Sequence, residues 1–382
     1  SRLGGRRPRR SVTKVSAPDL RRVEQQLEAL AEADPSYAAQ LAVYVHGELV
    51  LDLCVGMSTE AVLPVFSSSK GLIGGVVGLL VQSELLDLDA PVAATWPEFA
   101  AAGKHGVTVR QLLSHQAGLP TVDGGFTTAE LLAHAPLAER LAAQLPFWQP
   151  GSAFGYHSLT IGVLADELVR RNTGRTLAAY VAEVAAAVGA EVYLGVEDCA
   201  DLRLLDVGLP TEAELAEWAD RLPLPNPTSL SIRSAPVDGP PTWLALDTAA
   251  YRSAGPPAVG AMASARGLSR WYAALGSGVD GEPPLLTTSV LAYLSQVQAS
   301  GTDLLTGLPG RFGVVFQVPH GPRLTFGSWR AVGHDGLGGS LAFYDPEQAV
   351  AFGYVPRRIP LPGGADVRAV CLATTVRECL RQ

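Results

Sequence analysis

The sequence predicts an α+β protein whose antiparallel sheet is built from both ends of the chain. Runs rich in β-branched and aromatic residues occur near the two ends, at 40–53 and within 312–355. The stretch 67–190 shows helical periodicity and loops only, with no convincing strand. Because strands from the two ends can bury their apolar faces by pairing with each other, the helical stretch becomes an insertion between them.

This pattern predicts two lobes. Residues 18–66 and 300–382 form a sheet lobe flanked by helices, and residues 67–299 form a mainly helical lobe. The length of 382 residues exceeds that of a usual single core, which agrees with such a division. The arginine-rich arm at 1–17 is expected to be disordered, and the proline-rich segment at 221–257 is expected to be irregular.

The first elements are a helix and a hairpin. Apolar residues recur at helical spacing over 18–33, and Asp34-Pro35 ends that helix. Two β-rich runs follow at 40–45 and 48–53. Because only His46-Gly47 separates them, the runs predict a hairpin with a tight turn.

The helical lobe begins with a helix that starts at Ser67 and continues through Leu80, with no charged residue after Lys70. Thr108 caps a short helix that ends before Gly118 and Pro120. Further helices are predicted within 127–145 and at 159–171, 176–188, 262–275 and 287–296. The last quarter predicts strands at 312–318, 340–344 and 349–355 and a closing helix at 366–381.

Composition and charge exclude several classes of function. The net charge of −8 argues against nucleic acid as a partner, and the apolar run 71–81 is too short and glycine-rich to span a membrane. The four cysteines show no C-x-x-C spacing, so neither a disulfide framework nor a zinc site is predicted. No apolar signal segment follows the N-terminal arginines, and this pattern favours a cytoplasmic protein.

A serine and a lysine three residues apart, Ser67 and Lys70, are the main candidates for chemistry. Positions i and i+3 share one face of a helix, so the hydroxyl and the amine meet within hydrogen-bonding reach. The uncharged run after Lys70 predicts burial, and a desolvated lysine can lose its proton and serve as the base that serine needs. The alternative is that Ser67 only caps the helix.

Two further segments carry candidate groups. Tyr156 precedes a helix, and a tyrosine hydroxyl near a lysine can act as acid and base; the alternative role is packing. His334 lies in the glycine-rich stretch 333–339, whose backbone can approach a ligand closely; the alternative is a hairpin with a surface histidine. Trp329, just upstream, is a candidate pocket wall or a core residue.

Three motifs in order carry a resemblance to a known superfamily. Ser67-Ser68-Ser69-Lys70, Tyr156-His157-Ser158 and His334-Asp335-Gly336 resemble the motifs of the serine β-lactamases and penicillin-binding proteins. Within this superfamily, the sequence resembles the class C β-lactamase-like carboxylesterases, which are the family VIII esterases. Supporting stretches are 86–92, 96–99, 109–120, 148–151 and 333–340. The resemblance runs from about residue 40 to 355 and implies a β-lactamase/transpeptidase-like fold.

The resemblance implies a role for each matching position. Ser67 would be the acyl-accepting nucleophile, activated by Lys70 and Tyr156, and His334 would stand where β-lactamases carry lysine. The backbone N–H groups of Ser67 and Leu337 would form the oxyanion hole. The substrate site would be shaped by Ser158, Asp335 and Gly336. The implied partner is a small-molecule ester or acyl donor, and no metal or organic cofactor is implied.

The third motif departs from the β-lactamase pattern, which is Lys-Thr-Gly. A histidine is mostly neutral at pH 7, and Asp335 adds negative charge, so little or no β-lactamase activity is predicted. We expect a carboxylesterase that forms an acyl-enzyme on Ser67 and accepts esters of small or medium acyl groups. The alternatives are an acyltransferase or peptide-cyclising enzyme with the same acyl-enzyme, a β-lactamase or DD-peptidase, and a scaffold without catalysis.

Overall fold

The computed structural model of the protein describes residues 19–196, 203–219, 229–239, 248–321 and 324–381. The arm predicted at 1–17 lies outside these ranges, as does part of the proline-rich segment 221–257. None of the helices in the described ranges combines the length and the apolar character that crossing a bilayer requires.

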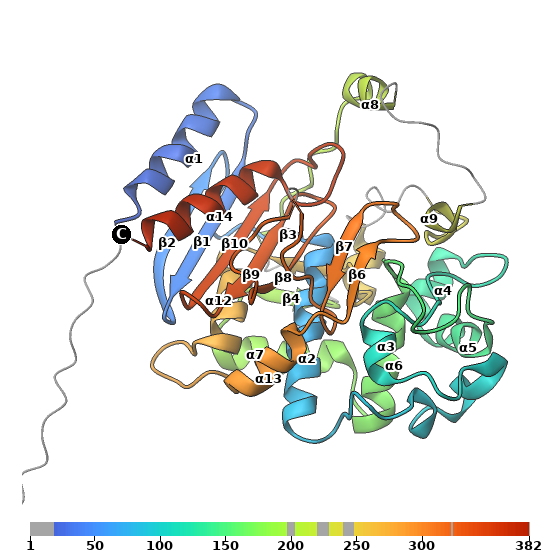
Figure 1. The fold of residues 1–382 in the computed structure, drawn as a ribbon. Helices are drawn as coiled ribbons and strands as arrows, with labels where there is room; N and C mark the ends of the chain where they lie inside the picture. The colour runs from blue at the N-terminus through green and yellow to red at the C-terminus, as the bar shows by residue number, and fades with distance from the viewer. Residues whose placement is uncertain (1–18, 197–202, 220–228, 240–247, 322–323, 382) are drawn as a thin grey trace, which may run out of the picture.

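The main sheet is antiparallel and has five strands, in the order β2-β1-β10-β9-β8 (Figure 1). Its strands are β1 (Ala39–Val45), β2 (Glu48–Val55), β8 (Val332–Asp335), β9 (Leu341–Asp345) and β10 (Val350–Pro356). Strand β1 pairs with β10 from Ala39 opposite Pro356 to Val45 opposite Val350. This pairing confirms the prediction that both ends of the chain build the sheet.

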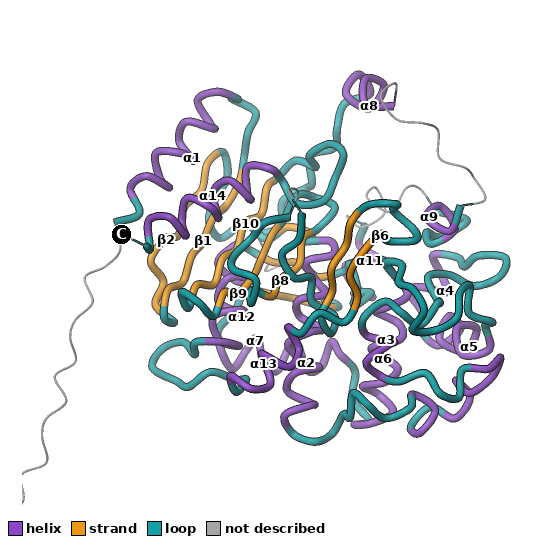
Figure 2. Tube along the Cα trace, in the orientation of Figure 1, coloured by secondary structure: helices purple, strands orange, loops and turns teal. Residues whose placement is uncertain are grey.

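Both faces of the sheet are covered by helices. Leu41 and Val43 of β1 pack in one core with the terminal helices, whereas Ala42 and Tyr44 belong to the larger core on the opposite face. This alternation follows from the two-residue period of a strand. The terminal helices are α1 (Arg21–Ala33) and α14 (Val367–Cys379), which lie side by side along the strands (Figure 2).

Helix α12 (Ala265–Gly276) covers the second face and changes the expected division of the chain. It lies within 67–299, the range expected for the helical lobe, but it packs on β1, β9 and β10. The helix also begins later than predicted. Met262 belongs to a short strand, β5 (Ala261–Ala263), and the Ser264 side chain caps α12 by accepting the Gly267 N–H at 2.9 Å. Strand β5 pairs with β3 (Leu63–Pro64) and β4 (Val192–Leu194).

The strand predicted at 312–318 is wrong beyond its first residue. Strand β7 (Pro309–Phe312) pairs with β6 (Ala299–Thr302) and stops at Phe312. The following apolar residues are buried in an irregular segment, where Val315 has φ 66° and donates its N–H to Leu113 O at 2.8 Å. Periodicity alone cannot distinguish a short buried strand from a buried loop whose backbone bonds to several separate segments.

The helical lobe contains most of the predicted helices. Threonines 108, 127, 176 and 287 cap four of them as N-cap residues. The helices of the described chain outside the sheet layer are α2 (Lys70–Gln82), α3 (Val109–Leu113), α4 (Thr128–Ala133), α5 (Ala135–Ala143), α6 (Thr160–Thr173), α7 (Leu177–Val188), α8 (Glu212–Ala219), α9 (Leu230–Arg233), α11 (Ala249–Ala254) and α13 (Thr288–Ser295), with 3-10 turns at Val92–Ala94 and Pro97–Gly103.

Helix α2 is the central helix of the molecule, and it is buried on nearly all sides. Its glycines let large aromatic side chains approach the backbone closely. A Cβ atom on Gly74, for example, would lie 2.5 Å from the Phe316 ring. A helix without charges after its first residue fits such a position. Burial of α2 also fixes the position of the residues at its N-terminus.

Candidate active site

A single 3-10 turn, Phe66–Ser69, precedes α2 and places Ser67 where the sheet meets the helices. Phe66 has a φ of 50°, which is a strained backbone conformation for a bulky residue and is found most often at functional sites. The predicted helix therefore starts one residue before Ser67 and as a tighter turn. Its first internal hydrogen bond runs from Ser68 N to Val65 O at 3.1 Å. The N–H of Ser67 precedes that bond and is free of a partner within the turn.

The three adjacent serines have different environments. Ser68 is buried and bonds to His334 O at 3.2 Å and to the Ser340 hydroxyl at 2.9 Å. Ser69 is buried and donates to Phe66 O at 2.5 Å. Only the Ser67 hydroxyl is partly exposed and in contact with Lys70. This arrangement makes Ser67 the serine that a substrate can reach.

Lys70 is fully buried, and its amine is hydrogen-bonded to three oxygens. The distances from Nζ are 3.2 Å to Ser67 Oγ, 2.8 Å to Ser158 O and 3.0 Å to Ala258 O. No ion pair with Lys70 occurs in the described part of the chain. Burial lowers the pKa of Lys70 to about 7, although the Asp335 carboxylate acts in the opposite direction. A neutral amine that donates to the two carbonyls keeps its lone pair for the Ser67 hydroxyl.

Tyr156 lies beside this pair. Lys70 Nζ is 4.8 Å from the centroid of its ring, and the ring stacks on His334 and Phe312 with centroids 6.0 and 5.8 Å apart. Burial raises the pKa of Tyr156 well above its usual value, and a hydrogen bond with the Ser67 side chain acts in the opposite direction. The hydroxyl therefore keeps its proton at neutral pH and can donate it.

His334 is the last residue but one of β8 and is fully buried. Its Nδ1 donates to Asp335 O at 2.7 Å, so Nε2 carries the lone pair. Burial, and next the charge of Lys70, lower the pKa of His334 well below its usual value. The side chain is neutral at pH 7, while the Asp335 carboxylate accepts the Ala365 N–H at 2.8 Å. The third motif thus brings no positive charge to Ser67.

The turn after His334 packs directly on the segment before Ser67. A Cβ atom on Gly336 would lie 2.4 Å from Val65 O, so only glycine fits at that position. The turn is closed by hydrogen bonds from Gly336 N to Ser340 O and from Gly339 N to Gly336 O, both 2.9 Å. The N–H of Leu337, within this turn, has no hydrogen-bond partner in the described ranges. Two free backbone N–H groups, of Ser67 and Leu337, are the donors that an oxyanion requires.

The predicted residues do not all join this cluster. Ser158 contributes its backbone carbonyl to Lys70, not its side chain. Trp329 is 72% exposed, and its ring lies under the Arg330 guanidinium. It precedes Val332, which pairs with Tyr344, whereas the site lies at the other end of the hairpin, where Asp335 pairs with Leu341. The structure therefore does not bring Trp329 to Ser67.

Other contacts of the cluster were not expected from the sequence. The carbonyl of Ala258 is one, and a backbone group gives no residue-type signal. His115, His157 and Asp303 also lie against the Tyr156 segment. His115 lies in the stretch 109–120, which supported the resemblance, but its position there pointed only to the end of a short helix.

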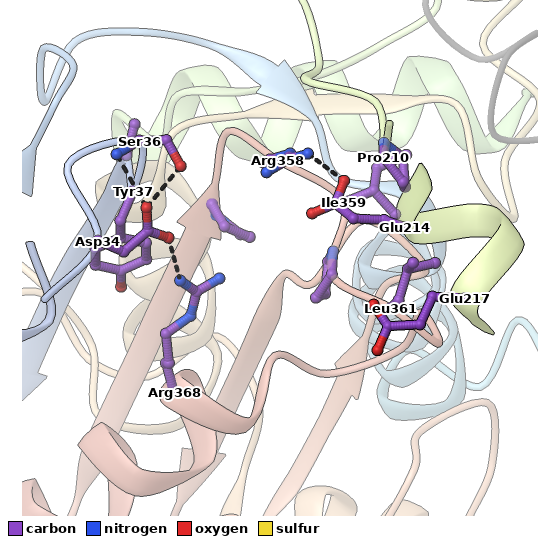
Figure 3. Close-up of a pocket in the computed structure, with 13 residues that line it drawn as sticks. Asp34, Ser36, Tyr37, Pro210, Glu214, Glu217, Arg358, Ile359, Leu361 and Arg368 are labelled. Atoms are coloured by element: carbon purple, nitrogen blue, oxygen red, sulfur yellow. Dashed lines mark hydrogen bonds and ion pairs between the residues drawn. The ribbon is translucent and has the colours of Figure 1, made fainter. Parts of the chain in front are cut away.

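Two cavities of the structure lie away from this cluster. One, of about 330 Å³, lies between α8, the turn before β1 and residues 358–361 (Figure 3). Its lining includes the ion pair of Arg358 with Glu214. The other, of about 390 Å³, lies against α5 and Trp96. Neither is lined by Ser67, Lys70, Tyr156 or His334.

Comparison with known proteins shows the family of the chain. The sequence model of the β-lactamase family matches residues 23–370. The chain belongs to the β-lactamase family. The structure accordingly has the β-lactamase/transpeptidase-like fold, with mixed helices and an antiparallel sheet.

Among members of the β-lactamase family, the chain is similar to several esterases. The structure of EstA from Arthrobacter nitroguajacolicus Rue61a is 40% identical, with a TM-score of 0.89, covering 96% of this chain and 98% of EstA. A family VIII carboxylesterase is 30% identical, with a TM-score of 0.82, covering 95% of this chain and 98% of the carboxylesterase. The esterase/β-lactamase LipL of Mycobacterium tuberculosis is 33% identical, covering 84% of this chain and 77% of LipL. The chain is thus a carboxylesterase/β-lactamase-like hydrolase.

Proposed function

We propose that this protein is a serine carboxylesterase in which Ser67 attacks an ester carbonyl and becomes acylated. The observation that carries the proposal is the contact between Ser67 and a buried lysine whose pKa is about 7. A serine hydroxyl needs a neighbouring base, and a lysine that is half deprotonated at neutral pH provides one. The esterases among its relatives support the same class of reaction.

The first half-reaction transfers the acyl group to Ser67. Neutral Lys70 takes the hydroxyl proton as Oγ bonds to the carbonyl carbon, and the N–H groups of Ser67 and Leu337 stabilise the oxyanion. The carbon–oxygen bond to the alcohol then breaks. The leaving alkoxide takes a proton from Tyr156, and Tyr156 regains one from the Lys70 ammonium. The acyl-enzyme and a free alcohol result.

The second half-reaction repeats these steps with water. Lys70 takes a proton from the water as its oxygen bonds to the acyl carbon. The bond to Ser67 Oγ breaks, Ser67 regains its proton, and the carboxylic acid leaves. If an alcohol or an amine replaces the water, the same acyl-enzyme gives acyl transfer, so the acceptor alone distinguishes these two activities.

The charges around Ser67 favour neutral esters over β-lactams. A β-lactam carries a carboxylate, which a charged hydrogen bond from a lysine would stabilise in a β-lactamase. Here the corresponding His334 is neutral and buried, and Asp335 brings a negative charge. Absence of one charge-assisted hydrogen bond costs roughly 1.5–3 kcal/mol, which corresponds to a rate loss of about 10- to 100-fold.

We therefore expect kcat/KM for p-nitrophenyl esters to exceed that for nitrocefin by about 10- to 100-fold. A series of p-nitrophenyl esters of increasing acyl length, assayed beside nitrocefin at the same pH, measures this ratio. Equal or faster nitrocefin hydrolysis would overturn the assignment as an esterase. Added alcohols in the same assay divide the acyl-enzyme between hydrolysis and transfer, and the product ratio identifies the preferred acceptor.

Replacing Tyr156 with phenylalanine should lower kcat by about 10²- to 10⁴-fold, because the leaving alkoxide loses its proton donor. The ring and its stacking on Phe312 and His334 remain, so thermal unfolding should change little. The loss should be smaller for p-nitrophenyl esters, whose leaving group needs no proton, than for ethyl esters of the same acid. A loss below threefold with both esters would make Tyr156 a packing residue only.

A further inference from the structure

The backbone around Tyr156 is held by three successive hydrogen bonds from outside its own segment. Gly155 N donates to His115 O at 3.2 Å, Tyr156 N to Asp303 Oδ2 at 2.8 Å and His157 N to His115 Nδ1 at 3.0 Å. Residues 153–157 belong to neither a helix nor a strand, so no regular ladder sets their position. Two residues, His115 and Asp303, therefore bind all three N–H groups.

His115 is built into the fold at some cost. It is fully buried and has a φ of 65°, a left-handed conformation that is uncommon for residues other than glycine. Because Nδ1 accepts the N–H of His157, the ring proton is on Nε2, which has no partner in the described part of the chain. The ring packs against Tyr156 and Phe312, with centroids 5.1 and 4.5 Å away. Burial lowers the pKa of His115, which keeps Nδ1 an acceptor at neutral pH.

Asp303 holds the same backbone through its side chain. It follows β6 and is only 3% exposed. Oδ2 accepts the Tyr156 N–H, while Oδ1 accepts the N–H groups of Leu305 and Thr306 at 2.8 and 3.0 Å. No ion pair of Asp303 occurs among the described residues. Burying a carboxylate without a cation is costly, and its hydrogen bonds here join the β6–β7 hairpin to Tyr156.

We infer that His115 and Asp303 are positioning residues, which hold the Tyr156 backbone from two separate segments of the chain and so keep its hydroxyl at Ser67. The inference rests on the proposed function, in which Tyr156 protonates the leaving group. A displacement of about 1 Å of a reacting group can cost about 10²-fold in rate. Neither side chain need touch the substrate, so both act on kcat through Tyr156 and leave KM little changed.

Two substitutions at position 115 distinguish the effect of the Nδ1 acceptor from that of the rest of the side chain. Both glycine and asparagine tolerate a positive φ, and both remove the ring. Only asparagine keeps an acceptor, its Oδ1, close to the position of Nδ1. We expect kcat for ethyl esters to fall by about 10²-fold in His115→Gly and by less than about tenfold in His115→Asn. Equal loss in the two variants would overturn the role of the acceptor.

Asp303→Asn provides an independent test that keeps the size of the side chain. Its amide retains one acceptor oxygen, which can serve either Tyr156 or the hairpin, so we expect kcat to fall by about tenfold to 100-fold. If His115→Gly fails to fold, as judged by urea unfolding, this variant carries the test alone. Full activity of folded Asp303→Asn and His115→Gly would refute the inference.

A double-mutant cycle distinguishes positioning from general destabilisation. In the Tyr156→Phe background no hydroxyl remains to be positioned, so His115→Gly and Asp303→Asn should cause no further loss of kcat with ethyl esters. The same loss in both backgrounds would show a merely structural role and overturn the inference. Labelling of the wild type by a fluorophosphonate probe tests the proposed function separately. No labelling would refute that function, and with it this inference.

Discussion

Replacing Ser67 with alanine should abolish ester hydrolysis and labelling by a fluorophosphonate probe. We expect kcat to fall by about 10⁴- to 10⁶-fold, as when the nucleophile of other serine hydrolases is removed. The reason is that no other hydroxyl of the 3-10 turn is available, since those of Ser68 and Ser69 are buried and bonded within the protein. Mass spectrometry of the labelled protein, together with steady-state kinetics, measures both effects.

Ser68→Ala is the matched control, with the same chemical change one residue away. It removes the hydrogen bonds to His334 O and to Ser340, and we expect a loss of stability of about 1 kcal/mol. Its Ser67 should still be labelled and still turn over substrate. Labelling that persists in Ser67→Ala, or that disappears in folded Ser68→Ala, would show that another serine is the nucleophile.

Much of the fold could be predicted because local signals agree with the long-range pairing. The hairpin turn at His46 and Gly47 has φ values of 50° and 83°, as a tight turn between twisted strands requires. The predictions fail where tertiary contacts outweigh periodicity. Residues 313–318 are as apolar as a strand, yet the N–H groups of Val314, Val315 and Gln317 bond to three separate segments, at Leu294, Leu113 and Gly333. Met262 forms part of a short strand because β3 and β4 pair with it on both sides.

The candidate site was predictable where side chains on one helical face or at one turn do the chemistry. The spacing of Ser67 and Lys70 alone predicts their contact, which the structure shows at 3.2 Å. The other hydrogen-bond partners of Lys70 could not be found in this way. Two of its partners are backbone carbonyls, of Ser158 and Ala258, and any residue can supply a carbonyl. Asp303 lies 147 residues after Tyr156, and only the folded chain brings them together.

Replacing Lys70 with methionine should lower kcat/KM by about 10²- to 10⁴-fold, because Ser67 loses its base. Methionine fills a similar volume without an amine, so the buried site should not collapse. The variant should also be at least as stable as the wild type at pH 7, since removing a buried, unpaired charge relieves its desolvation. Ester kinetics and urea unfolding of both proteins measure these effects. Near-normal turnover of the variant would refute Lys70 as the base.

The pH dependence tests the protonation state of Lys70 directly. Below pH 7 the amine is an ammonium ion and cannot accept the Ser67 proton, so kcat/KM should rise with pH through about 7 and level off above it. The free energy of unfolding should also increase with pH. The pKa of Lys70 is lower in the folded than in the unfolded state, so the unfolded state binds more protons between about pH 7 and pH 10.4, the ordinary value for lysine. The free energy of unfolding relative to Lys70→Met should therefore increase with pH over that range and stay constant below it. A flat difference between the two proteins, or activity that persists unchanged at pH 5, would show that Lys70 is not neutral when Ser67 reacts.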